Sequence, residues 1–62
     1  MYKCVIESKN NRKELIIDHR SAIKAAREYG CREQGEIIRV YSGSTLLSMA
    51  KWSGNVYYSC CT

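Results

Sequence analysis

The sequence has few of the residues that build catalytic and metal sites. It contains a single histidine, His19, and none of its four cysteines stands in a C-x-x-C pair, so the usual spacing of zinc ligands is absent. Gly43 and Gly54 are isolated turn glycines, and neither belongs to a glycine-rich phosphate-binding loop. Asp18 and His19 with a cysteine could form a nucleophile and its base, but both stand at a predicted helix start. We therefore expect no enzymatic activity, no metal and no cofactor.

The chain also lacks long apolar segments. No apolar run approaches the roughly 18 residues that a membrane-spanning helix needs, and the N-terminal MYKCVIESKN lacks the apolar stretch of a secretion signal. We therefore expect a cytoplasmic protein with no membrane partner. In that compartment the four cysteines, Cys4, Cys31, Cys60 and Cys61, favour reduced thiols over disulfides. Without proline, repeats or linkers, residues 1–62 are expected to form a single domain.

What the chain does contain is a modest and uneven excess of positive charge. Ten Lys and Arg against six Asp and Glu give a net charge of +4. Residues 1–36 hold eight of the basic and all six of the acidic residues, whereas residues 37–62 hold only Arg39 and Lys51. Such a balance permits contact with nucleic acid but does not require it.

The first half of the sequence changes period from strand to helix. Residues 1–9 alternate polar and apolar side chains, residues 10–13 form a polar turn, and residues 14–18 are rich in β-branched residues, which together predict a hairpin. Residues 18–30 then place alanines and other apolar residues at helical spacing. Asp18 or Ser21 can cap this helix of about three turns, and Gly30 can end it in a left-handed conformation.

Three further strands are predicted in the second half, over residues 36–42, 45–52 and 56–61, separated by short turns rich in Gly, Ser and Asn. The element order is therefore ββαβββ. The fold class is α+β, with one helix packed on one face of an antiparallel sheet.

The uncharged C-terminal part predicts a protein-binding surface. Charge depletion with aromatic enrichment is typical of interface centres, and Tyr57, Trp52, Tyr41 and Arg39 are the candidate contact residues. Alternation predicts that Tyr58 points inward and Tyr57 outward. In the competing interpretation, Trp52 and Tyr58 simply complete a small core. A weakly charged edge strand also permits pairing with a second copy.

Basic residues in the first half support a second hypothesis, contact with nucleic acid. Arg20, Lys24 and Arg27 recur along the exposed face of the predicted helix, and Arg12 and Lys13 stand in the first turn. Together these residues could follow a phosphate backbone. The competing interpretation is an ordinary solvated helix face, whose field is diluted by nearby glutamates.

The segments AIKAAREYG and VYSGSTLLSMAKW resemble a loose group of small proteins carried by phages and integrative elements of Gram-positive bacteria. That group includes inhibitors of host defence, among them anti-CRISPR proteins. The resemblance implies a non-enzymatic accessory or inhibitory protein that acts in the host cytoplasm. Its implied partner is a protein, either alone or as part of a host complex that carries nucleic acid. It implies no particular functional residue.

Overall fold

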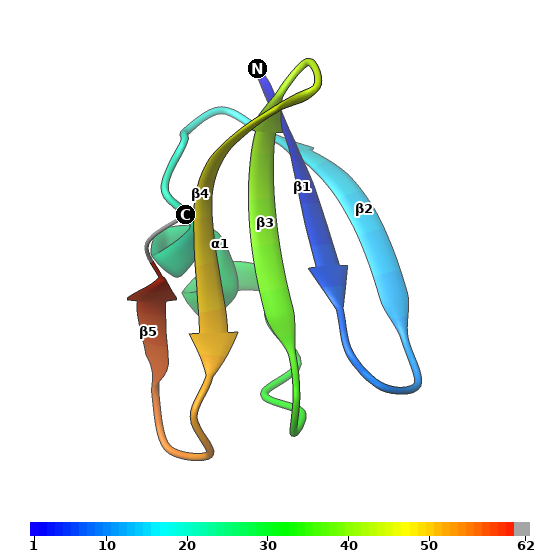
Figure 1. The fold of residues 1–62 in the computed structure, drawn as a ribbon, viewed down its shortest axis with the longest axis vertical. Coiled ribbons are helices and arrows are strands. Elements are labelled where there is room, and N and C mark those ends of the chain that lie inside the picture. The colour runs from blue at the N-terminus through cyan, green and yellow to red at the C-terminus, as the bar shows by residue number, and fades with distance from the viewer. Residues whose placement is uncertain (61–62) are drawn as a thin grey trace.

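The computed structural model describes residues 1–60 and contains one five-stranded antiparallel sheet and one helix (Figure 1). The elements, in chain order, are β1 (Tyr2–Glu7), β2 (Arg12–Ile17), α1 (Ala22–Tyr29), β3 (Ile37–Ser42), β4 (Thr45–Trp52) and β5 (Tyr57–Cys60). In space the strands follow the order β2-β1-β3-β4-β5. The predicted α+β class and the order ββαβββ are confirmed. Cys61, which the sequence places at the end of the last strand, lies outside the described residues.

The first hairpin turns earlier than its sequence predicts. Its turn is closed by a hydrogen bond from the Ser8 amide to the Asn11 carbonyl, 2.8 Å long. Arg12 and Lys13, predicted in the turn, are the first two residues of β2 and pair with Glu7 and Ile6. Both basic side chains are therefore held on a strand, where alternation sends them to opposite faces of the sheet.

The helix is shorter than expected and ends differently. Ser21 caps it by accepting a hydrogen bond from the Lys24 amide, but α1 has only eight residues, about two turns. Gly30 was expected in a left-handed conformation, and it instead has φ −68° and ψ 150°. A side chain at this position would collide with the Tyr57 hydroxyl and the Ala26 carbonyl. Glycine is therefore needed here for space, not for its backbone freedom.

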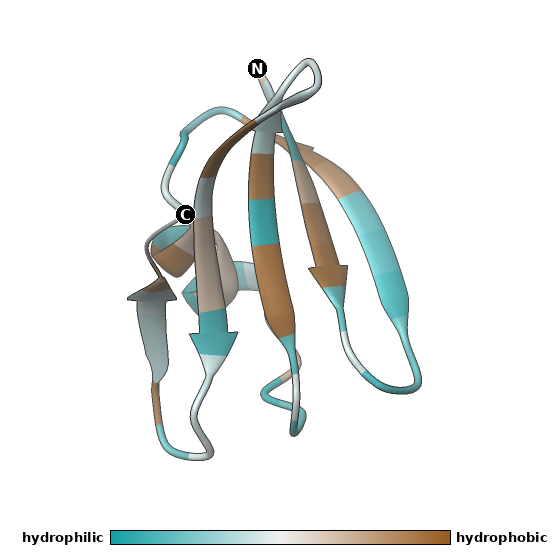
Figure 2. Ribbon diagram, viewed as in Figure 1, coloured by the Kyte–Doolittle hydropathy of each residue, from teal (hydrophilic) through white to brown (hydrophobic). Residues whose placement is uncertain are grey.

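The core lies between α1 and one face of the sheet. The strands contribute Cys4, Ile6, Ile38, Val40 and Ala50, and each of them is 3% exposed or less. The helix faces them with three alanines, Ala22, Ala25 and Ala26, which allow its backbone to sit close to the sheet. Figure 2 shows apolar segments on β1 and β3, with a hydrophilic segment between the two on β3.

A β-bulge and a serine fix the helix against β4. The pairing of β3 with β4 shifts between Val40 and Tyr41, so that Leu47 is an extra residue on β4. The hydroxyl of the next residue, Ser48, donates to the Arg20 carbonyl at 2.5 Å and accepts from the Ala22 amide at 3.0 Å. This polar contact positions the start of α1. The helix, the only one in residues 1–60, is too short and too polar to cross a membrane.

Candidate interaction surface

The sheet face opposite α1 carries no covering element among the described residues (Figure 1). We call it the open face. The strand registers place on it side chains from all five strands: Lys3, Val5, Glu7, Arg12, Glu14, Ile16, Ile37, Arg39, Tyr41, Leu46, Met49, Lys51, Tyr58 and Cys60. Arg39 and Tyr41, two of the four candidate contact residues, lie on this face, opposite the buried Ile38 and Val40.

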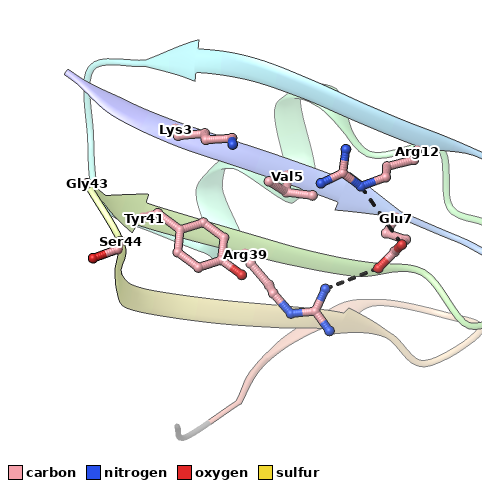
Figure 3. Close-up of a pocket in the computed structure, with 8 residues that line it drawn as sticks. All are labelled: Lys3, Val5, Glu7, Arg12, Arg39, Tyr41, Gly43 and Ser44. Carbon is pink, nitrogen blue, oxygen red and sulfur yellow. Dashed lines mark hydrogen bonds and ion pairs between the residues drawn. The ribbon is translucent and has the colours of Figure 1, made fainter.

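Cations outnumber carboxylates on the open face. Glu7 accepts from Arg39 at 3.3 Å and lies 4.0 Å from the Arg12 guanidinium (Figure 3). Glu14 pairs with Lys3 at 2.9 Å and also with Arg12. Hydrogen bonds from Lys3 and then Arg12 lower the pKa of the Glu14 carboxyl. With Lys51, the face holds four cations against these two carboxylates, a formal charge of +2.

A shallow hollow of about 370 Å³ lies within the open face, over β1 and β3. Figure 3 shows its walls, formed by Lys3 and Arg12 on one side and by Tyr41 and Arg39 on the other. Val5 lines it and is only 5% exposed, because the longer polar side chains around it cover it. The hollow thus combines an apolar floor, one phenol ring and several cationic groups.

Tyr57 does not lie on this surface, so its predicted outward orientation is wrong. It pairs with Trp52, on the helix side of the sheet, and is 6% exposed. Tyr58 pairs with Lys51 on the open face and is 46% exposed. The strand begins at Tyr57, and Val56 is in the preceding loop and 60% exposed. The choice of Tyr58 as the inward residue was therefore wrong too.

Tyr57 belongs to a buried hydrogen-bond network centred on Glu36. Its hydroxyl donates to the Glu36 carboxylate and accepts from the Arg32 amide at 2.8 Å. The same carboxylate accepts from the amides of Cys31, at 2.8 Å, and Arg32, at 3.1 Å. Burial, and then the bond to Glu36, raise the pKa of Tyr57 to about 12. The network holds loop 30–36 against β5.

Trp52 packs beside Tyr57 and not on the open face. The two ring centroids are 4.8 Å apart and the rings are tilted by 55°. Trp52 is partly buried and contacts the core cluster. Of the four residues predicted as partner contacts, Arg39 and Tyr41 thus share the open face, whereas Trp52 and Tyr57 contribute to the core.

The five basic residues predicted to contact nucleic acid do not form one surface. Arg12 lies on the open face, and Lys13 donates to the Tyr29 carbonyl on the helix side. Arg20 precedes the helix, with its carbonyl bound by Ser48. Lys24 and Arg27 alone remain on the exposed side of α1. The predicted continuous stripe is therefore divided.

Cys31, Glu33 and Glu36 offer potential metal-ligand atoms within 4.8 Å of one another. Both carboxylates already have protein donors. Glu36 holds two amides and the Tyr57 hydroxyl, and Glu33 accepts from Ser8 at 2.7 Å and from Asn11 at 3.4 Å. The two carboxylates therefore serve to hold loop 30–36 in place through these hydrogen bonds. Unlike the exposed Cys31, Cys4 is buried in the core, and burial raises the pKa of its thiol, which makes it a poor nucleophile.

Sequence reasoning missed several members of the open face, namely Lys3, Val5, Ile37, Met49 and Tyr58. The alternation of β1, β3 and β4 would have placed the first four on the face that carries Arg39. The role of Glu36 left no sequence signal, because it depends on a tyrosine 21 positions away. Comparison with protein families, curated proteins and solved structures finds no match for the chain.

Proposed function

We propose that this protein is a non-enzymatic binding module whose open face contacts an acidic, partly apolar surface of another protein. The single observation that carries the proposal is the composition of that face. Tyr, Met and Arg, residue types enriched in protein interfaces, lie there beside aliphatic side chains, and the four cations of the face outnumber its two already paired carboxylates.

The apolar side chains of the open face support a partner on this side of the sheet. Ile37, Tyr41, Leu46 and Met49 are partly buried, yet they do not belong to the set packed against the core. They stand on a surface that has no second layer among residues 1–60. Contiguous apolar surface rimmed by polar groups is typical of a protein-contact site.

Charge selects among the candidate occupants. A second copy laid face to face would oppose two surfaces of charge +2, which disfavours it. The uncharged edge of β5, Tyr57–Cys60, is the remaining route to self-pairing. A nucleic acid would satisfy the cations, but the aliphatic residues Ile37, Leu46 and Met49 give bases few rings to stack on. An acidic protein surface matches both the charge and the aliphatic content.

An inhibitor of host defence, as the resemblance to phage and mobile-element proteins implies, would act through this surface. It would do so by covering an acidic functional surface of a host protein or of a nucleic-acid-bearing host complex. The mode is steric and needs no chemistry from the inhibitor.

Replacing Tyr41 with a photo-crosslinking amino acid tests the proposal in host cells, with the same residue at Lys24 as the control on the helix side. We expect a crosslinked protein from position 41 whose attached segment is rich in Asp and Glu. With that protein purified, Tyr41→Ala or Arg39→Gln should weaken its affinity by about thirtyfold or more. Lys24→Gln should leave it unchanged. An unaltered affinity in both open-face variants, or a crosslink only to a second copy, would contradict the proposal.

Nucleic-acid binding remains the second proposal, now confined to Lys24 and Arg27. Both are exposed on α1, and neither forms an ion pair with a carboxylate of residues 1–60. The double variant Lys24→Gln/Arg27→Gln should make the plot of log affinity for duplex against log salt concentration less steep, by the amount expected for the loss of about two phosphate contacts. No duplex binding by the native protein at low salt would exclude it.

A further inference from the structure

A second hollow lies on the helix side of the sheet, away from the open face. Its volume is about 580 Å³, and its lining residues come from α1, loop 30–36 and the β4–β5 hairpin: Arg27, Arg32, Trp52, Asn55, Val56 and Tyr57. Two arginines, a tryptophan and an asparagine thus line one depression. None of the functions proposed above uses this combination.

Neither arginine is neutralised by the described residues. Arg27 stands in the last turn of α1 and Arg32 follows it by five positions in the loop. Both are exposed, and no carboxylate of residues 1–60 lies within ion-pair distance of either guanidinium. A phosphate group would supply the missing counter-charge, and arginine binds phosphate through paired N–H groups.

The backbone of Arg32 is held in an unusual conformation. Its φ is +57°, and among residues 1–60 it is the only residue other than glycine with a positive φ. Its amide is bound by both Glu36 and the Tyr57 hydroxyl, which fixes that geometry. For the backbone alone glycine would be favoured. Backbone strain of this kind accumulates at functional sites, which directs attention to the arginine side chain.

Trp52 supplies an aromatic wall. It is only partly buried, and it also lines a neighbouring hollow with Gln34, Ser53 and Gly54. Its ring is braced by Tyr57 at a centroid distance of 4.8 Å. Bases stack favourably on such rings, and Asn55 adds a donor and an acceptor at the rim.

We propose that the hollow binds a nucleotide, with the phosphate held between Arg27 and Arg32 and the base against Trp52. The ligand chemistry, a phosphate attached to an aromatic base, is shared by a free nucleoside monophosphate and by the 5′-phosphorylated end of a single strand. This site is separate from the open face, so a test of nucleotide binding does not depend on whether the protein-partner proposal is correct.

Trp52 is the sole tryptophan of the chain and therefore reports directly on its own site. Titrating the native protein with nucleoside monophosphates at low ionic strength should quench its fluorescence, with saturation by millimolar ligand. The matching unphosphorylated nucleoside should bind at least about tenfold more weakly, because it lacks the charge-assisted bonds. No quenching by any nucleotide, or equal quenching by the nucleoside, would overturn the proposal.

Variants separate the site from general charge effects. Arg27→Gln and Arg32→Gln should each weaken nucleotide binding by about tenfold, while Lys24→Gln, on the same helix but outside the hollow, should not. Thermal melts confirm that each variant folds, and Arg27→Gln keeps the test valid if Arg32→Gln does not. A 5′-phosphorylated oligonucleotide binding more tightly than the monophosphate identifies a strand end as the ligand. Equal affinities for the oligonucleotide and the monophosphate identify the free nucleotide as the ligand. Equal losses of nucleotide affinity in Arg27→Gln, Arg32→Gln and Lys24→Gln would contradict the proposed site.

Discussion

Tyr57 shows how one side chain is fixed by partners distant in sequence. Adjacent tyrosines on a strand face opposite ways, and alternation alone does not say which of them is inside. The structure resolves the choice through Glu36, whose buried carboxylate needs hydrogen-bond donors. Two of these are backbone amides of loop 30–36 and the third is the Tyr57 hydroxyl. Tyr57 is therefore expected to contribute to stability instead of partner binding.

Tyr57→Phe keeps the buried ring and removes only the hydroxyl. We expect a loss of roughly 1–3 kcal/mol in the free energy of unfolding, because Glu36 loses a donor and the Arg32 amide loses an acceptor. In a domain of this size each kcal/mol lowers the melting temperature by about 4–8 °C. Tyr58→Phe, on the exposed neighbour, should change stability by about 0.5 kcal/mol or less. Equal melting temperatures for the two variants would show that the network adds no stability.

The same hydroxyl makes stability depend on alkaline pH. The pKa of Tyr57 rises to about 12 in the folded protein, from about 10 in an unfolded chain. The unfolded state therefore loses this proton first as the pH rises. The stabilisation, on the order of 2 kcal/mol, is fully present below about pH 10 and is lost between about pH 10 and 12.

Denaturant unfolding of the native protein and of Tyr57→Phe at a series of alkaline pH values measures this effect. The difference in stability between them should shrink as the pH rises through that window. A difference that stays constant would mean that the Tyr57 hydroxyl titrates alike in both states.

At the scale of elements, the sequence predicts periodicity well and boundaries poorly. The hairpin, the helix and the last three strands follow from apolar spacing that matches period 2 or 3.6. The start of β2 at Arg12 does not, because charged residues carry little strand preference and pairing with β1 decides their state. The bulge at Leu47 likewise depends on how two strands meet.

The end of α1 is determined by packing against β5. Gly30→Ala should cost roughly 1–3 kcal/mol, as overpacked core positions do, because the new methyl group would meet Tyr57 and the Ala26 carbonyl. Gly43→Asn is the matched control, since Gly43 has φ 62° in open space and asparagine tolerates that conformation.

A double variant locates the clash behind the Gly30→Ala prediction. In the Tyr57→Phe background Gly30→Ala should cost less, because the hydroxyl nearest the new methyl group is gone. Thermal or denaturant melts of the four proteins measure the coupling. Fully additive losses would show that the collision with Tyr57 is not the cause.

At the scale of the whole molecule, the division into a helix layer and a sheet layer determines which of the predicted contact residues share a surface. The helix covers one face of the sheet only, so residues predicted to share a patch are divided between two sides (Figure 1). Arg39 and Tyr41 were predictable as outward neighbours from the alternation of β3. That Lys3 and Met49 are their direct neighbours on this face was not predictable, because it requires the order β2-β1-β3-β4-β5, in which β3 lies between β1 and β4.

The two faces also differ in chemistry. The open face joins cations to aliphatic and tyrosine side chains, whereas the helix side offers Arg27, Arg32 and Trp52 around a separate hollow. The two hollows share no lining residue, so the two proposed ligands would not compete for the same side chains.

The central claim is that the open face is where the partner binds, and nuclear magnetic resonance tests it residue by residue. Isotope-labelled protein is titrated with the crosslinked partner once that partner has been purified. Amide and side-chain signals of Val5, Arg39, Tyr41 and Met49 should shift or broaden, and those of α1 should stay in place. Changes confined to α1 and loop 30–36, with an unperturbed open face, would contradict the account.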